Sequence, residues 1–112
     1  MTAKYKHRGI AIDYTPGSDV TAGDVVVQED LIGIAVNDIP DGRLGALTTE
    51  GVFELPKATG SGSDIDAGAQ LYWNGTDDRV EKTEGSPARP ALGKAVAAAA
   101  VADETVLVKI NV

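Results

Sequence analysis

Residues 91–112 read ALGKAVAAAAVADETVLVKINV, and this stretch decides between two folds. An alanine-rich run that follows Gly93 and Lys94 is typical of a helix leaving a phosphate-binding loop, whereas the alternation after Thr105 is typical of a β-strand. Alanine favours a helix by only a few tenths of a kcal/mol per residue, and strand pairing in a folded protein routinely overrides such a preference. The rest of the chain is needed to choose between them.

The two halves of the chain resemble each other. Both contain Ala-Gly, a strand around Gly-x-Ala-Val, a connection and a final strand. The matching segments are Ala22-Gly23, 33–36 and 43–49 in the first half, and Ala67-Gly68, 93–96 and 105–112 in the second. The second half carries a Trp-containing hairpin as an insert.

This repeat favours the strand interpretation of residues 91–112. In the first half, Pro40 and Gly42 break any helix after Val36, so that segment is a strand that meets a turn. By analogy, the sequence predicts a strand over 93–98, a connection over 100–104 and a closing strand over 105–112. A short helix over 95–102 remains the alternative.

Turn signals recur along the chain between short runs of Val, Ile, Leu, Tyr and Thr. Short strands at this spacing, roughly 8–12 residues, are typical of a sandwich or barrel. The predicted strands cover 9–14, 24–28, 31–37, 43–49 and 51–57, with a hairpin over 69–83 that turns at Asn74-Gly75. The predicted fold class is all-β: a small barrel or sandwich of short strands, with two pseudo-repeated halves, an extended N-terminal arm and little helix.

The length of 112 residues predicts a single β domain over 1–112, with a flexible basic arm over 1–9 and a β body over 10–112. The net charge is −7, but Lys4, Lys6 and Arg8 give +3 within the first eight residues. The remaining residues carry 17 acidic side chains. A basic arm on an acidic body suits a partner surface of mixed sign, and a solvated terminus is the alternative.

Composition excludes several classes of function. The chain has no cysteine, which rules out disulfides, Cys-zinc sites and thiol catalysis. The net negative charge argues against non-specific DNA binding, which draws on clustered Lys and Arg. No stretch approaches the roughly 18 apolar residues of a membrane span. We therefore expect neither a nucleic acid nor a membrane as partner.

Candidate catalytic motifs fail at their defining positions. A Walker A loop needs a glycine and a hydroxyl where this chain has Ala88 and Ala95. His7, the only histidine, lies in the arm, where we expect a solvated side chain with no part in catalysis. The acid pairs Asp64/Asp66 and Asp77/Asp78 lack the offsets of a calcium loop. The sequence thus predicts no enzyme, no cofactor and no metal site.

Tyr72 and Trp73 are adjacent in a predicted strand, so their side chains point to opposite faces. One of them is expected in the core. The other is a candidate interface anchor if it is exposed, and the alternative is that both cover the ends of a small barrel.

Four segments carry a resemblance to a known family: AGDVVV, GVFELPKA, LYWNGT and LGKAV followed by ETVLVKI, in that order. Together they resemble small tailed-phage head proteins that are often labelled capsid cement or decoration proteins. Some members carry an older label as predicted RecA/RadA-type recombinases. Ala88 and Ala95 break the phosphate loop that a recombinase needs, so the residues do not support that label.

The resemblance implies a β-rich, non-catalytic protein on the exterior of the virion capsid, made in the cytoplasm of the bacterial host. It also implies the major capsid protein as partner and a homotrimer or dimer at capsid symmetry positions. We expect the arm and first strand to bind the partner. The candidate residues are Tyr5, Lys6, Arg8, Ile10, Ile12 and Trp73. The alternative function is a non-catalytic binding module of a phage tail or of a host-surface carbohydrate contact.

Overall fold

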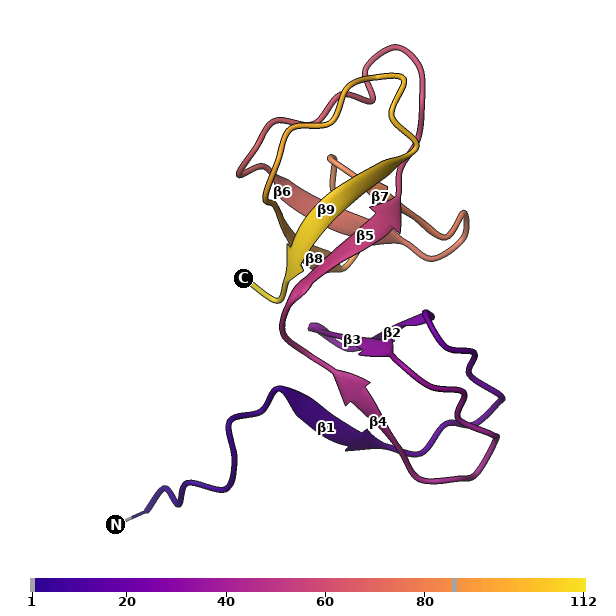
Figure 1. Cartoon of the computed structure of the whole chain (residues 1–112), viewed down its shortest axis with the longest axis vertical. Coiled ribbons are helices and arrows are strands. Elements are labelled where there is room, and N and C mark those ends of the chain that lie inside the picture. Colours follow the sequence, from indigo (N-terminus) through magenta and orange to yellow (C-terminus); the bar gives the residue numbers. More distant parts are fainter. Residues whose placement is uncertain (1, 86) are drawn as a thin grey trace.

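The computed structural model describes residues 2–85 and 87–112, which form two antiparallel sheets and contain no helix (Figure 1). The strands are β1 (Ala11–Tyr14), β2 (Val25–Gln28), β3 (Leu31–Ala35), β4 (Gly45–Thr48), β5 (Val52–Pro56), β6 (Gln70–Asn74), β7 (Arg79–Glu81), β8 (Ala91–Ala95) and β9 (Thr105–Ile110). Within these residues, no helix long and apolar enough to cross a membrane occurs. The all-β prediction is confirmed. The arrangement is sandwich-like, and the sheets do not close into a barrel.

The repeat seen in the sequence is a repeat of topology. The first sheet has the strand order β1-β4-β3-β2, and the second has β5-β9-β8-β6-β7. Residues 11–14 pair with 45–48, and the equivalent residues 52–55 pair with 106–109 in the same antiparallel register. The equivalence follows from the next strand, because Ala35 lies opposite Leu47 and Ala95 lies opposite Val108. Each half therefore builds the same four-stranded unit.

The inserted segment is smaller than the sequence predicts. β6 occupies the place of β2, because both pair with the strand that carries the Gly-x-Ala-Val segment. Only β7 has no counterpart in the first sheet. The hairpin itself is confirmed, since Trp73 pairs with Val80.

The hairpin turn does not use the backbone freedom that the Asn-Gly signal predicts. Among the described residues of this loop, the positive φ belongs to Asp78, at 52°, and not to Asn74 or Gly75. The side chain of Asn74 instead accepts hydrogen bonds from the backbone N–H groups of Thr76 and Asp77, at 3.1 and 3.2 Å. This Asx turn organises a longer loop.

Residues 91–112 form strand, turn and strand, as predicted, and the helix alternative is wrong. The first of these strands ends at Ala95, three residues earlier than predicted. The Val96 N–H still donates to the carbonyl of Leu107 in β9 at 3.0 Å. The chain then bends, and Ala99 pairs with Ile65, donating a backbone hydrogen bond of 2.8 Å. Backbone groups of the alanine run thus form hydrogen bonds with residues far away in the chain. These bonds outweigh the local preference of alanine for helix.

β3 lies between two apolar cores and is buried on both faces, as its continuous apolar sequence predicts. Ile32 and Ile34 pack into the larger core with side chains of the second sheet, such as Leu71 and Val108. On the other face, Ala35 packs with Ile39 and Leu47 in a smaller core. The two sheets therefore share apolar contacts. That residues 1–112 form a single domain is consistent with this shared core and stays a prediction.

Candidate functional site

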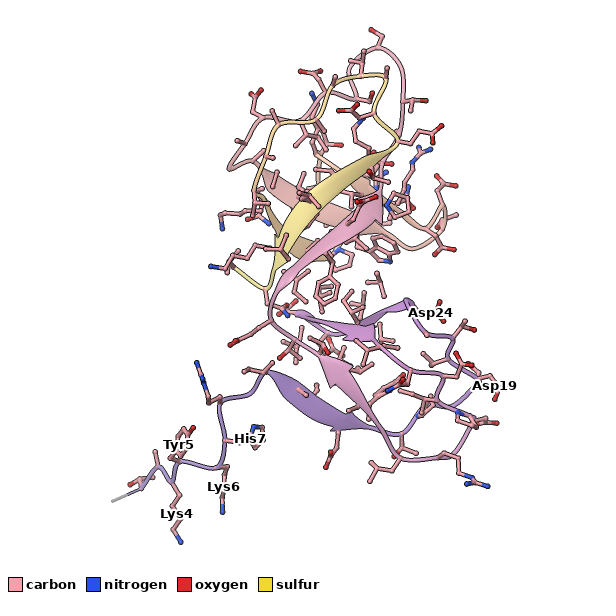
Figure 2. The ribbon with its side chains drawn as sticks, in the orientation of Figure 1. Lys4, Tyr5, Lys6, His7, Asp19 and Asp24 are labelled. Carbon is pink, nitrogen blue, oxygen red and sulfur yellow. The ribbon has the colours of Figure 1, made fainter. Side chains whose placement is uncertain are left out.

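The N-terminal arm projects away from both sheets, and every residue over 2–8 is exposed (Figure 2). Thr49 holds its base, because the Thr49 backbone N–H donates to the carbonyl of Ile10 at 2.7 Å and its hydroxyl donates to the carbonyl of Gly9. Beyond this point, the structure over 2–85 and 87–112 records no side-chain hydrogen bond or ion pair for the three cations of the arm, Lys4, Lys6 and Arg8. Their charges face solvent.

Five of the six predicted partner-binding residues lie along this arm and the first strand. Tyr5 is 80% exposed and Ile10 is 44% exposed, so both offer apolar surface to a partner. Lys6 and Arg8 are also exposed. Ile12 is half-buried against the smaller core and so serves the fold as well.

The structure corrects the prediction that Trp73 is a partner-binding residue. It is 7% exposed and belongs to the larger core, so the core alternative holds and the exposed interface anchor does not. The alternation of β6 places Trp73 inward with Leu71, while Tyr72 between them is half-buried.

A groove runs between β2 and the second half of the chain, with a volume of about 560 Å³. Val25, Val27, Leu55 and Pro56 line it, together with the small exposed part of Trp73. The acidic residues Asp19, Asp24 and Asp78 also line it. No sequence signal identifies this groove, because its two walls come from segments that only the tertiary structure brings together.

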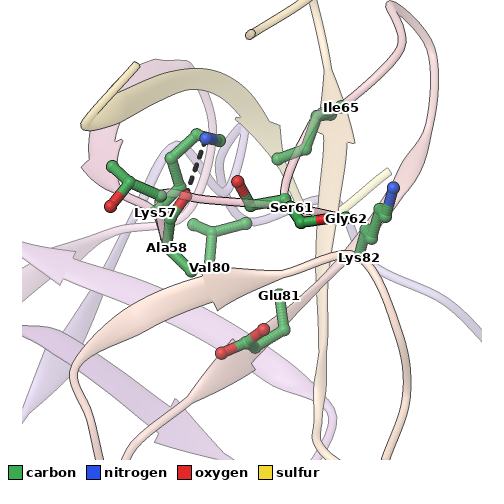
Figure 3. Close-up of a pocket in the computed structure, with 10 residues that line it drawn as sticks. Lys57, Ala58, Ser61, Gly62, Ile65, Val80, Glu81 and Lys82 are labelled. Atoms are coloured by element: carbon green, nitrogen blue, oxygen red, sulfur yellow. Dashed lines mark hydrogen bonds between the residues drawn. The ribbon is translucent and has the colours of Figure 1, made fainter. Parts of the chain in front are cut away.

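Lys57 is a buried lysine that sequence reasoning missed. It is 6% exposed, and its Nζ donates to the backbone carbonyls of Ala58, Ala100 and Asp103 at 2.7, 3.0 and 2.9 Å. Figure 3 shows Lys57 and its bond to Ala58 beside a small cavity of about 190 Å³. Three acceptors match the three N–H donors of an ammonium group. Lys57 therefore fastens two loops together.

Several carboxylates of the second half are used in ion pairs. Asp64 pairs with Lys82 at 3.4 Å, and Glu81 accepts a hydrogen bond from Arg79 at 2.7 Å. Burial raises the pKa of Glu81, but hydrogen bonds from Arg79 and Asn74 and the nearby arginine charges outweigh burial and hold that pKa below its usual value. Over residues 2–85 and 87–112, no group of three His, Cys, Asp or Glu side chains is placed to hold a metal.

The position of the failed phosphate loop is occupied by a strand. Ala95 ends β8, and Lys94 beside it is exposed on the same strand, paired with Lys109 of β9. A strand directs alternate side chains to opposite faces and cannot wrap its backbone amides around a phosphate. The geometry of this region is that of a structural sheet.

The sequence model of a family described as phage cement protein matches residues 6–110. The chain belongs to the phage cement protein family. The match begins within the basic arm and ends at the last residue of β9, so it covers both repeated halves. As a cement protein, the chain is a structural phage protein associated with the capsid.

The comparisons with curated proteins and with solved structures give no match for this cement protein. Its assignment therefore rests on the family model and on an all-β fold of short strands.

Proposed function

We propose that this chain binds the outer surface of a phage capsid and stabilises the shell. The family match to phage cement proteins carries this proposal. Packaged DNA strains a shell, and a clamp that bridges neighbouring subunits opposes that strain. Such a clamp needs modest interfaces in many copies, because avidity then replaces high affinity at any one site.

The arm and first strand are the proposed binding element of this cement protein. Among the described residues, β1 pairs only with β4, so its other edge offers backbone groups to which a partner strand can add. Ile10 at the base of the arm supplies exposed apolar surface beside this edge. Tyr5, Lys6 and Arg8 extend further out, where the two cations would meet acidic groups in the assembled head.

Co-sedimentation with expanded, cement-free heads of the phage tests this function. We expect saturable binding at a fixed ratio to the major capsid protein, and we expect deletion of residues 1–9 to abolish it while the body stays folded. Ile10→Ser removes the exposed apolar side chain at the base of the arm, and we expect it to weaken binding. Val101→Ser makes the same kind of change at an exposed loop position in the second half of the chain, and we expect it to leave binding unchanged. Failure of the folded full-length chain to bind expanded heads would refute the proposal.

The remaining assembly features are part of the same proposal: the major capsid protein as partner, the virion exterior as location, synthesis in the bacterial host, and a homotrimer or dimer as the bound form. A carbohydrate-binding module of a tail or host-surface contact is the weaker alternative. An exposed tryptophan beside a groove would favour it, but Trp73 is 7% exposed.

A further inference from the structure

We infer that the groove beside β2 binds the basic arm, residues 4–8, of a second copy of this chain. The inference names one partner of the arm and rests on the proposed function only in treating the arm as a binding element. It concerns the free protein and gives the oligomer a head-to-tail contact.

The groove has the chemistry of a site for an extended basic segment. Val25, Val27 and Leu55 supply apolar surface, and Asp19, Asp24 and Asp78 supply negative charge. None of the described residues that line it is basic. Its volume of about 560 Å³ lies within the range of pockets that bind ligands.

Two of these carboxylates are held in place by the backbone of the first half. Asp24 accepts a hydrogen bond from the backbone N–H of Thr21 at 2.9 Å, and Asp19 accepts one from Asp41 at 2.8 Å. Because each carboxylate has two oxygens, these bonds fix the side chains and leave acceptor capacity for an incoming cation.

β2 adds a backbone interaction to this surface. Of the strands that the structure describes, it pairs with β3 alone and so forms one edge of the first sheet. An edge strand exposes a row of N–H and C=O groups that a second extended chain can pair with. A segment lying along β2 would gain backbone hydrogen bonds, apolar contact and ion pairs together.

The arm matches this surface in both charge and pattern. In an extended chain, Lys4, Lys6 and Arg8 point to one side, and Tyr5 and His7 point to the other. The cations thereby face the acidic residues of the groove while Tyr5, which is 80% exposed in the free chain, faces its apolar surface. Burial of an exposed aromatic ring is a frequent source of binding energy at interfaces.

The topology directs this contact between copies. β1, which carries the arm, and β2, which borders the groove, are opposite edges of the same sheet. Figure 2 shows Lys4, Tyr5 and Lys6 on one side of the molecule and Asp19 and Asp24 on the other. An arm that enters the groove of the next copy leaves its own groove open for a third arm. Such head-to-tail contacts form a closed ring when the rotation permits, as a homotrimer requires.

The absence of cysteine from the chain permits a direct test by disulfide crosslinking. Tyr5→Cys is placed in one preparation of the full chain and Val27→Cys in another, and the two are mixed under mild oxidation. We expect a crosslinked heterodimer between them. Tyr5→Cys mixed with Val101→Cys, an exposed position outside the groove, should give no more than background crosslinking.

Charge reversal provides a second test that does not depend on the strand register. Lys6→Glu with Arg8→Glu reverses the arm, and Asp24→Lys with Asp78→Lys reverses the groove. We expect each double variant to weaken self-association at least about tenfold by sedimentation, and a mixture of the two to recover association. Asp66→Lys, an exposed acid outside the groove, should leave association unchanged. Thermal unfolding of every variant checks the fold.

The outcomes separate this inference from the proposed function. Unchanged oligomer size in both charge-reversed variants, together with no Tyr5–Val27 crosslink, overturns the arm-in-groove contact even if the protein binds capsids. A wild-type chain that is monomeric in solution overturns it as well. Oligomerisation through the groove without any binding to expanded heads leaves this contact standing and refutes the cement function instead.

Discussion

The side chain of Asn111 acts as a strand partner for the backbone of Ile32, although the two residues belong to different halves of the molecule. Asn111 Oδ1 accepts a hydrogen bond from the Ile32 N–H at 2.9 Å, and its Nδ2 donates to the Ile32 carbonyl at 2.7 Å. Nδ2 also donates to the carbonyl of Thr49 at 2.7 Å. The amide thus pairs with the backbone of β3 just after β9 ends and ties the two sheets together.

Replacing Asn111 by glycine should destabilise the protein by about 1–3 kcal/mol, because part-buried backbone groups of Ile32 and Thr49 lose their partner. Glycine is chosen because Asn111 has a φ of 60°, a conformation that glycine adopts without strain. Urea unfolding measures the effect. Asn37→Gly, at an exposed bend, is the matched control, and equal stability of the two variants would contradict the role of Asn111.

Gly93 marks a close approach between β8 and β9. A methyl group added at this position would collide with the backbone carbonyl oxygen of Lys109 and would lie 2.8 Å from the Cα of Ile110. Since backbone atoms of a paired strand move only with their strand, we expect Gly93→Ala to cost about 1–3 kcal/mol of unfolding free energy. Gly17→Ala, where the added methyl has nothing within 4 Å, should cost less. A wild-type melting temperature for Gly93→Ala would show that the two strands separate more easily than their pairing indicates.

Lys57→Met keeps the aliphatic stem of the buried lysine and removes its ammonium group. The carbonyls of Ala58, Ala100 and Asp103 then lose a charged donor, and we expect a loss of about 1–3 kcal/mol in stability. We also expect faster amide hydrogen exchange over 58–63 and 100–104, the loops that Lys57 joins. Lys94→Met, at an exposed position of β8, controls for loss of one positive charge. Unaltered exchange in both loops would contradict the fastening role.

The carboxylate of Glu81 should make the hairpin of β6 and β7 sensitive to acid. The pKa of Glu81 is lowered from its usual 4.5 in the folded protein, where hydrogen bonds from Arg79 and Asn74 outweigh the effect of burial. A group whose pKa is lowered on folding adds stability above its unfolded pKa, and that stability is lost as the pH falls through the folded pKa. Glu81→Gln should therefore flatten the decline of unfolding free energy below about pH 4.5 relative to the wild type. Glu104→Gln, an exposed acid, provides the comparison, and an equal acid response in all three proteins would show that the pair adds no stability.

The sequence carried most of the information on strands and on family. The periodic Val, Ile and Leu positions located the strands, because strand periodicity is local and survives in any context with one buried face. The order of matched segments located the repeat, which the identical registers of β1–β4 and β5–β9 confirm. The cluster of basic residues at the N-terminus identified the arm, because charged side chains stay in contact with water, and residues 2–8 are all exposed.

The position of Trp73 and the end of the strand in the alanine run required the tertiary structure. Both strand faces beside Trp73 carry large side chains, so the face that packs inward depends on where the other sheet lies. The strand of residues 91–95 ends where Ala99 has to reach Ile65, a partner more than thirty residues away. Local strand propensity does not depend on such a distant partner and therefore cannot predict where the strand ends.

The sequence by itself determined an all-β fold with two repeated halves and a basic arm, because alternation, turn residues and charge are properties of neighbouring positions. The cement family was indicated by the resemblance of four segments. Only the tertiary structure decided that Lys57 is enclosed by carbonyls, that Asn111 pairs with Ile32, and that an acidic groove borders β2. Each of these features joins segments that are distant in the chain. Its energy comes from matching donors, acceptors and surfaces across that distance, which no local pattern of residues specifies.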